Sequence, residues 1–382
     1  DGEIDRLLAL LRPLERPTCP FPEVPKLPRV RRPDIVWVDP VLVAEVSFAE
    51  WTHEGHLRAA SYVGLRDDKA VNDVRRELEP LPAELRRGAR TVRLTSLEKP
   101  FWPEEGITKG DLLSYYRAVA DVLVPHLRGR PFTMKRHPDG WQGKHFFQKN
   151  LPEHAPDWIR RAPFAASTRD GEQRIIDYGL VDDELALLWM VNMGCIEMHA
   201  WASRADRPDR PDWVMFDLDP SADVGFAETV EVALLVKEAL DLLELESYPK
   251  TSGSRGIHVL VPVARRHDWD EVRRFAEIVA GAIARAHPGL ATTEWSKAKR
   301  RGVLIDANQN GAGKTNATVY SVRARAGALV STPLRWEELR PGLDLAGFTM
   351  DVVLDRIARD GDIFAPVLQG RQSLTRALKT VG

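Results

Sequence analysis

Two carboxylates lie one residue apart at the end of an apolar run, in Val214-Met215-Phe216-Asp217-Leu218-Asp219-Pro220. Side chains alternate along a β-strand, so we expect Asp217 and Asp219 on one face and Leu218 in the core behind them. Carboxylates this close repel each other unless a cation lies between them, and Mg²⁺ or Mn²⁺ prefers oxygen ligands of this kind. The alternative is a pair of solvated acids at the end of a strand.

A second apolar run, Val303-Leu304-Ile305-Asp306, also ends in an acid. Three carboxylates at strand ends could hold two divalent ions for in-line phosphoryl transfer. We therefore predict that Asp217, Asp219 and Asp306 are the catalytic residues and the metal ligands, with two Mn²⁺ or Mg²⁺ ions as cofactors.

Donors for a triphosphate are present in one predicted turn, residues 251–258 (Thr-Ser-Gly-Ser-Arg-Gly-Ile-His). Gly253 and Gly256 would let backbone N–H groups approach an anion. Side chains that add donors are Ser252, Arg255 and His258. Glycine-rich turns are common, so this segment alone does not identify a phosphate site.

Two arginines, Arg323 and Arg325, are spaced i, i+2 in a segment expected to be a strand. That spacing puts both guanidinium groups on one face, where they suit a phosphate clamp, although such a pair is often only a solvated surface.

Two segments imitate other phosphate-handling motifs. Gly311-Ala312-Gly313-Lys314-Thr315 is similar to the end of a P-loop, but Asn308 stands where its first glycine belongs and a β-like run follows, so we reject a P-loop. The Asp217-Leu218-Asp219 sequence is also similar to the nucleophile loop of haloacid-dehalogenase-type phosphatases. Pro220-Ser221 replace the usual Gly-Thr of that loop, and a phosphatase remains the outside alternative.

The elements expected around these residues mix α and β. Thr108 and Asp111 start a helix whose apolar stripe continues to Leu123 and which ends before Gly129. Further helices are expected at 227–245 and 269–287, the second opened by a capping box of Asp268 and Glu271, and strands at 213–218, 257–263 and 303–306.

Composition narrows the class of protein. The chain has 382 residues with 43% hydrophobic content, enough for more than one core, and its net charge of -2 excludes a histone-like mode of binding. Cys19 and Cys195 have no Cys or His neighbours at metal-ligand spacing, which argues against a zinc site. No apolar run is long enough to span a bilayer, so we expect no membrane partner. The start at Asp1 suggests a fragment.

Several ordered blocks together resemble the archaeo-eukaryotic primase superfamily, and within it the polymerase domain of bacterial ligase D, an enzyme of non-homologous end joining. The resemblance covers residues 91–378. It rests on residues 94–99 (LTSLEK), 102–103 (WP), 108–112 (TKGDL), 143–149 (GKHFFQK), 194–199 (GCIEMH), 216–220 (FDLDP), 252–258 (SGSRGIH) and 320–325 (YSVRAR).

The resemblance implies an α+β primase-polymerase domain over residues 91–382, with a central mixed or antiparallel sheet and flanking helices. It also implies that a primer 3′-hydroxyl attacks the α-phosphate of a nucleoside triphosphate and that Asp217, Asp219 and Asp306 hold the metals. Nucleotide-binding residues implied by it are His199, Ser252, Arg255, His258, Arg323, Arg325, Lys135, Phe146 and Phe147, with Arg136 nearby.

Partners are implied in the same way. Lys99 and Lys109 would bind the 5′-phosphate of a DNA end at a gap or overhang, although each could be an ordinary surface lysine. Phe146 and Phe147 would stack on bases, although adjacent phenylalanines are often in a core. The resemblance further implies the end-binding protein Ku, the ligase and nuclease domains of full-length relatives, and work at the nucleoid in a bacterial cytoplasm.

The chain departs from the family pattern at four positions. Ser254 and Arg255 stand where the family more often has Gly and Lys, which keeps a cation but crowds the turn. Ala307 and Val319 replace an aromatic residue and a proline around the third acid.

The N-terminal segment, residues 1–75, resembles the end of the OB-fold of an ATP-dependent DNA ligase, followed by a linker at 76–90. Two alternating runs, 35–38 and 41–48, are expected strands, and Arg66, Asp68 and Lys69 match the closing motif of that domain. We expect no ligase activity, because the adenylated lysine belongs to an upstream domain, and we expect a partial barrel with unpaired edges and exposed apolar surface.

Two hypotheses of function follow. The first is a polymerase that adds nucleotides to DNA ends during break repair. The second is a non-catalytic end-binding module that retains the fold and holds phosphates with Lys297, Lys299, Arg300 and Arg301. The three acids favour the first, because an inert binder of a polyanion has no use for three clustered carboxylates.

Overall fold

The computed structural model describes residues 2–20, 35–51, 57–68, 71, 81–167, 173–340 and 342–381. The chain divides into two compact units, residues 1–77 and residues 78–382.

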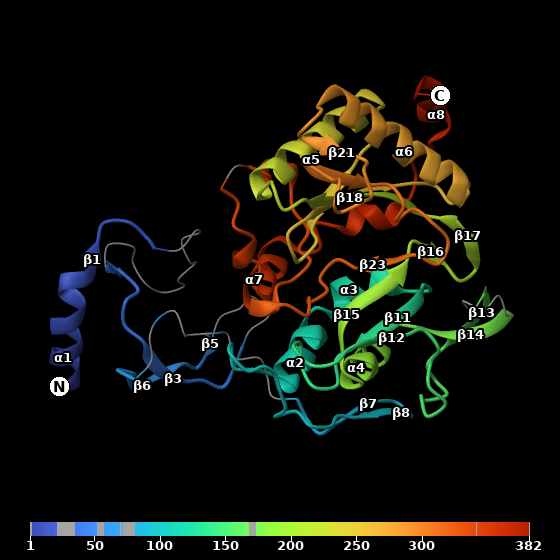
Figure 1. Ribbon diagram of the computed structural model, residues 1–382. Coiled ribbons are helices and arrows are strands. Elements are labelled where there is room, and N and C mark those ends of the chain that lie inside the picture. The colour runs from blue at the N-terminus through green and yellow to red at the C-terminus, as the bar shows by residue number, and fades with distance from the viewer. Residues whose placement is uncertain are drawn as a thin grey trace. The chain divides into compact units, whose positions relative to one another are not determined.

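The N-terminal unit contains one helix, α1 (Gly2–Leu11), the turn η1 (Arg12–Leu14) and short strands (Figure 1). The strands form three antiparallel pairs: β1 (Glu15–Arg16) with β2 (Trp37–Val38), β3 (Ala44–Ser47) with β6 (Ser61–Leu65), and β4 (Glu50–Trp51) with β5 (Leu57–Arg58). The described strands therefore make ribbons of two strands and no closed barrel.

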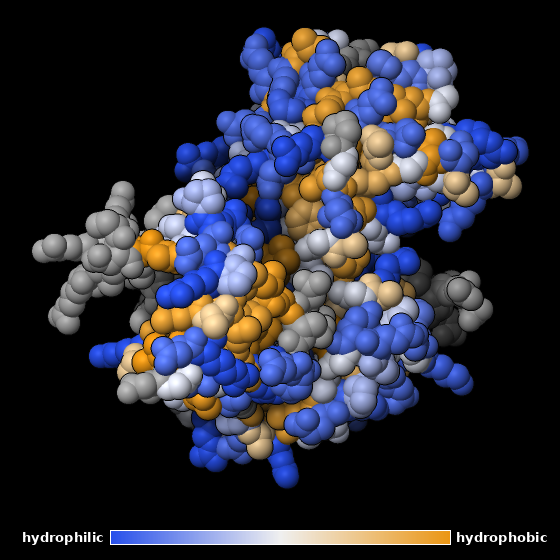
Figure 2. All heavy atoms as spheres, turned by 90° about the vertical axis from the view of Figure 1, so that its left-hand side faces the viewer, coloured by the Kyte–Doolittle hydropathy of each residue, from blue (hydrophilic) through white to orange (hydrophobic). Residues whose placement is uncertain are grey.

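None of the described residues of this unit is buried. Large side chains left exposed include Ile4, Val36, Val41, Phe48 and Val63, and Figure 2 shows hydrophobic colour in several places on the face that it displays. Arg66 donates to Asp68 and lies 3.3 Å from Glu45; Lys69, the third residue of the predicted closing motif, lies outside the described residues. The exposed apolar surface is what an incomplete barrel leaves.

The second unit begins with a hairpin of β7 (Glu84–Arg87) and β8 (Arg90–Arg93). Part of this hairpin falls in the segment expected to be a linker. Leu85 and Val92 are buried in the larger core, which explains why the segment is ordered.

The first large sheet has six strands and is antiparallel. The order is β13 (Arg161–Ser167), β14 (Gln173–Leu180), β11 (Pro131–Arg136), β15 (Cys195–Trp201) and β23 (Thr315–Ala317), with β12 (Phe146–Gln148) also paired to β11. Three helices share its core and lie beside it in Figure 1: α2 (Lys109–Ala118), α3 (Ala120–Leu127) and α4 (Glu184–Asn192).

The second sheet has five strands in the order β19 (Tyr248–Thr251), β20 (Ile257–Pro262), β18 (Trp213–Pro220), β22 (Val303–Asp306) and β21 (Ala291–Thr292). Only the β21–β22 pair is parallel. Helices α5 (Phe226–Leu242) and α6 (Trp269–Ala286) cover one face and form a separate core with it (Figure 1). The other face carries Asp217 and Asp219 together with Met215 and Leu260, which are buried in the first core.

The remaining elements are short or peripheral. They are β9 (Pro100–Trp102), β10 (Ile107–Thr108), β16 (Ser203–Arg204), β17 (Arg207–Pro211), α7 (Met350–Asp360), α8 (Thr375–Val381) and the turns η4 (Ala326–Ala328), η5 (Trp336–Glu338), η6 (Leu345–Gly347) and η7 (Ala365–Gln369). No helix in the described ranges is long and apolar enough to cross a membrane.

The helix starts expected from sequence are present. Thr108 and Asp111 form a reciprocal capping box, as do Asp268 and Glu271. The single helix expected after Thr108 is interrupted at Val119, whose φ of -93° and ψ of 2° separate α2 from α3. The α+β class is confirmed, and its strands are divided between an antiparallel sheet and a mixed one.

Candidate nucleotidyltransfer site

A row of polar side chains crosses the second sheet. Asp217 on β18 is directly opposite His258 on β20 and directly opposite Asp306 on β22. Residues directly opposite in antiparallel strands have Cβ atoms about 4.5–5.5 Å apart on one face, so the three side chains are neighbours. Asp219, two residues further along β18, shares that face.

The next strand adds a lysine behind the histidine. Lys250 on β19 is opposite His258, and its Nζ lies 2.8 Å from the imidazole Nδ1. The amine also donates to the carbonyl of Ala317 at 3.0 Å and to the Ser331 hydroxyl at 2.7 Å. The other ring nitrogen, Nε2, faces Asp217 Oδ1 at 3.2 Å, so the imidazole lies between the lysine and the acid.

The pKa values of the three acids are shifted in different directions. Burial opposes ionisation of Asp217, but His258 and the more distant Lys250 and Arg323 outweigh it, so the pKa of Asp217 is lowered. The pKa of Asp219 is raised to about 6, by loss of solvent and then by repulsion from Asp217 and Asp306. Burial likewise raises the pKa of Asp306.

The carboxylates are adjacent, and two of them make contacts with other groups of the protein. Asp306 accepts from the backbone of Asn308 at 2.8 Å and from the Gln309 amide at 3.1 Å, while Asp217 faces His258. No group of three or more acidic, His or Cys side chains in the described ranges has the geometry of a metal site. The donor set nevertheless suits a hard divalent cation: the ligands are oxygens, and a cation between them would remove the repulsion that raises the pKa of Asp219.

The glycine-rich turn packs against the acid strand. A Cβ at residue 256 would lie 2.4 Å from the carbonyl oxygen of Leu218, between the two acids of β18. Gly253 has a φ of +68°, and a Cβ there would meet Arg323 Cγ at 2.5 Å. Only glycine permits these approaches.

Ser252 closes the turn on itself. Its hydroxyl accepts from the backbone N–H groups of Ser254 at 3.2 Å and Gly256 at 3.1 Å. Arg255 is exposed and lowers the pKa of Asp219, so its charge acts on the acid cluster.

The first sheet contributes a second group of charges from β11 and β15. Glu197 Oε1 accepts from Lys135 Nζ at 2.7 Å, and its Oε2 lies 3.0 Å from His199 Nε2. Burial opposes ionisation of Glu197, but His199 and Arg323 lower its pKa well below the ordinary range, so it is ionised. Burial lowers the pKa of His199, whose Nδ1 has no partner among the described residues.

Arg323 joins the two sheets. Its Nε donates to Glu197 Oε2 at 3.1 Å, and its Nη1 donates to the carbonyl of Ser252 in the glycine-rich turn. The predicted twin, Arg325, does not share this position: the chain turns after an isolated bridge at Val322, and the Arg325 side chain is exposed. The expected strand face with two arginines is not formed.

The two adjacent phenylalanines are outside the core. Phe146 and Phe147 are 47% and 57% exposed, which excludes the alternative of core aromatics. The ring of Phe147 meets that of His199 edge to face at 5.9 Å, and the Arg136 guanidinium lies over Phe146 at 5.3 Å. Both rings therefore stand beside the charged group of the first sheet.

The two lysines predicted to bind a 5′-phosphate are close enough to repel each other. Lys99 Nζ donates to the Pro138 carbonyl and to Asp139, both at 2.7 Å. Lys109 is buried at the start of α2 and donates to Asn192 at 2.9 Å. Burial, and then repulsion from Lys99, lowers the pKa of Lys109 to about 8.

The basic segment named in the second hypothesis lies between β21 and β22. Lys297, Lys299 and Arg301 are exposed, and Arg300 is close enough to lower the pKa of Asp219. An exposed tryptophan, Trp295, precedes them.

Sequence reasoning gave no role to two residues that hold the site together, Glu197 and Lys250. Glu197 stands two residues before His199, and that i, i+2 spacing on a strand could have indicated a shared face. Lys250 gave no comparable indication, because only the pairing of β19 with β20 brings it to His258.

Comparison with known families gives two matches. Residues 108–364 match the family described as LigD, primase-polymerase domain, and residues 1–69 match the family described as ATP dependent DNA ligase C terminal region.

Curated relatives cover most of this chain. The multifunctional non-homologous end joining protein LigD of Mycolicibacterium smegmatis is 35% identical over 279 residues, 72% of this chain and 36% of the relative. The protein of the same description from Pseudomonas aeruginosa is 34% identical over 343 residues, 86% of this chain and 40% of the relative. The bifunctional LigD of Bacillus subtilis is 32% identical over 315 residues, 81% and 49%. The chain thus spans less than half the length of these three relatives.

Among solved structures, the polymerase domain of Mycobacterium tuberculosis ligase D in complex with DNA is similar, with a TM-score of 0.68 and 33% identity. The match covers 74% of this chain and 99% of that domain.

Proposed function

The chain belongs to the LigD primase-polymerase domain family, and from this premise we propose that residues 78–382 add nucleotides to primer 3′-hydroxyls at DNA breaks and gaps. The observation that carries the proposal is the row of Asp306, Asp217 and His258 across three paired strands, with Asp219 on the same face. Because the chain matches the LigD primase-polymerase family, we do not propose the alternative function of a phosphatase.

The three carboxylates would hold two divalent ions, Mn²⁺ or Mg²⁺. When bound, such ions neutralise the charge on the transferring phosphoryl group and activate the attacking oxygen.

The chain's own residues bind and orient the nucleoside triphosphate. Arg323 and the turn that begins at Ser252 would accept the phosphates, because the guanidinium fork and backbone N–H groups are suited to anions. His258 is held in place by Lys250 at its Nδ1, so that its Nε2 is directed at Asp217. His199 would meet the sugar, and Phe146 and Phe147 would stack on bases.

A 5′-phosphate at the far side of a gap would bind Lys99 and Lys109. Lys109 lies at the N-terminus of α2, which favours a bound anion, and its amine is already desolvated. Binding would draw these lysines from Asp139 and Asn192, which they contact now.

The relatives are described as end-joining proteins, and we extend that role to this chain. We propose that it works with an end-binding protein of the Ku type and with ligase and nuclease domains, and that the N-terminal unit has no sealing activity of its own.

An extension assay tests the proposal. The substrate is a gapped duplex with a 5′-phosphate, supplied with Mn²⁺ and labelled nucleotides, and the variants are Asp217→Asn and Asp306→Asn. We expect both variants to lose extension while DNA binding, followed by fluorescence anisotropy, stays unchanged.

The control is Asp241→Asn, an acid on α5 that is 53% exposed and pairs with Lys237. It should extend primers as the wild type does. A wild-type chain that binds the duplex but adds no nucleotide would instead support the non-catalytic module.

A further inference from the structure

A pocket lies near the start of β18, at the end of the strand opposite Asp217 and Asp219. It has a volume of about 820 Å³ and is lined by residues from the start of β13, the β16–β17 turn, the segment after β20 and the end of η7. Asp212, in its wall, precedes Asp217 by five residues along β18, which is roughly 17 Å at about 3.3 Å per residue. The pocket is therefore separate from the nucleotidyltransfer site.

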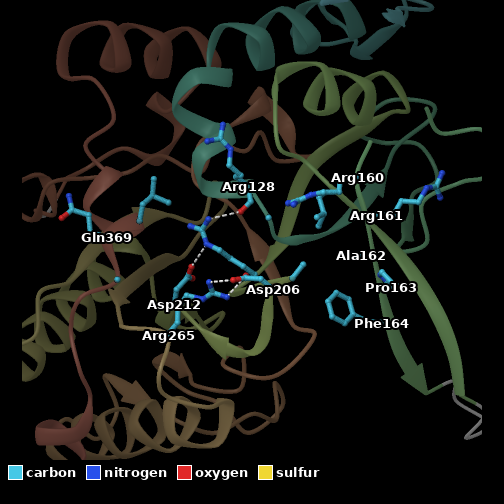
Figure 3. A pocket seen from close by; sticks show the side chains of 16 residues that line it. Arg128, Arg160, Arg161, Ala162, Pro163, Phe164, Asp206, Asp212, Arg265 and Gln369 are labelled. Atoms are coloured by element: carbon cyan, nitrogen blue, oxygen red, sulfur yellow. Dashed lines mark hydrogen bonds and ion pairs between the residues drawn. The ribbon is translucent and has the colours of Figure 1, made fainter. Parts of the chain in front are cut away.

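Five arginines line it: Arg128, Arg160, Arg161, Arg204 and Arg265. Figure 3 shows Arg128 and Arg160 on one side and Arg265 with the two aspartates on the other, and the Arg161 side chain is directed away from them. Arg128, Arg160, Arg204 and Arg265 are far apart in the sequence, so no helical or strand periodicity accounts for their meeting here.

The acids nearby do not balance these charges. Asp206 accepts two hydrogen bonds from Arg265, at 2.7 and 2.9 Å. Asp212 is shared by Arg204 and the fully buried Arg130. Arg160 pairs with Asp182 at 2.9 Å.

The arginines Arg128, Arg130, Arg160, Arg204 and Arg265 thus outnumber the three carboxylates that pair with them, Asp182, Asp206 and Asp212. In the described ranges Arg128 bonds only a backbone carbonyl, that of Asp182, and Arg160 pairs with the Asp182 carboxylate through its Nε. Several guanidinium donors are free to bind an anion.

One wall is apolar and rigid. Phe164 is half-buried, and its ring packs against Trp201 at 5.1 Å between centroids and against Tyr178 at 6.2 Å. Pro163 and Leu368 line the pocket beside it. A flat apolar surface next to free guanidinium groups suits a planar base attached to phosphates.

We infer that this pocket binds a nucleotide, with its phosphates on Arg128, Arg160 and Arg265 and its base against Phe164, which shares a face of the chain with Arg160 (Figure 3). The volume is in the range of small-molecule sites and is too small for a DNA duplex. The arginine fork matches phosphate oxygens in pairs, which lysines would not do.

Binding without a divalent metal separates this site from the acid cluster. The test titrates the full chain with ATP and with inorganic pyrophosphate in excess chelator, by calorimetry. We expect binding that persists in chelator and that weakens roughly tenfold to a hundredfold in the Arg160→Ala/Arg265→Ala double variant. The control is Arg376→Ala, an arginine 75% exposed on α8 that pairs with Glu244.

Photolabelling with an azido-adenine nucleotide gives a second measurement that does not depend on folding of a variant. Label on the peptide that contains Phe164 supports the inference. The inference is overturned if no binding persists in chelator, or if the double variant binds as well as the wild type. It is also overturned if the label lies only on other peptides, or if oligonucleotides and acidic peptides compete but nucleotides do not. The Asp217→Asn variant should keep this binding, so the inference and the polymerase proposal fail independently.

Discussion

A methyl group added at residue 256 should push β18, the strand that carries Asp217 and Asp219, away from β20. In Gly256→Ala, the new Cβ would lie 2.4 Å from the Leu218 carbonyl oxygen, whereas real Cβ contacts are essentially never under 3.0 Å. Neither partner can yield cheaply, because Leu218 is opposite Ile257 in the β18–β20 ladder. The strands must separate by at least about 0.6 Å.

The expected loss in the free energy of unfolding is about 1–3 kcal/mol, the usual cost of overpacking. Thermal unfolding should detect it as a fall in Tm of roughly 2–4 °C per kcal/mol. Because Asp217 and Asp219 flank Leu218, the same displacement should reduce turnover in the extension assay by roughly 10- to 100-fold, since about 1 Å of misplacement at a reacting centre costs a factor of that order.

Gly347→Ala is the matched control. This glycine is exposed, and a Cβ there would meet nothing within 4 Å. The reasoning is refuted if Gly256→Ala melts together with the control and extends primers at the wild-type rate. Loss of stability with normal turnover would refute only the link between the turn and the acids.

Three further outcomes are expected. Lys250→Met should lower kcat by roughly 10- to 100-fold with little change in the nucleotide KM. The reason is that the amine orients His258 beside the acids without touching the substrate, and an unchanged kcat would contradict this. Since the pKa of Lys109 is lowered to about 8, the amine is charged below that pH and neutral above it. The preference for a 5′-phosphate over a 5′-hydroxyl at a gap should therefore decline between about pH 7 and pH 9, and a flat profile in binding titrations would count against the role of Lys109. Replacing Phe146 and Phe147 by alanine should weaken single-strand binding by about 1–3 kcal/mol per stacked base, measured by anisotropy, with no change in Tm. Leu242→Ala, which alters a side chain 80% exposed, is the control for that loss.

The interpretation of the acids from sequence rested on alternation and run endings, which are local properties. The strands containing Asp217 and Asp306 are present at the expected positions, with the acids at or near their ends. The helix caps at Thr108 and Asp268 could also be predicted from the sequence, because both hydrogen bonds of a capping box form within four residues.

Non-local pairing decided what those residues do. No pattern in the chain states that β22 lies beside β18 in the register that sets Asp306 opposite Asp217. The same limit explains Arg325: its spacing from Arg323 predicted a shared face, but the chain turns there and Arg323 alone reaches Glu197. The hairpin at Glu84–Arg93 was taken for linker because its few apolar residues gain burial only from a distant core.

Contiguous residues are enough to indicate the chemistry available to this protein: the three acids, the turn of glycines with a serine and a histidine, the helix starts and the family resemblance. Only the folded chain brings Lys250 to His258, joins the two sheets at Arg323 through Glu197, and places Arg128, Arg160, Arg204 and Arg265 around one pocket. The physical reason is that local steric and hydrogen-bonding preferences act over a few residues, whereas strand order and the meeting of two sheets depend on burying apolar faces far apart in the chain.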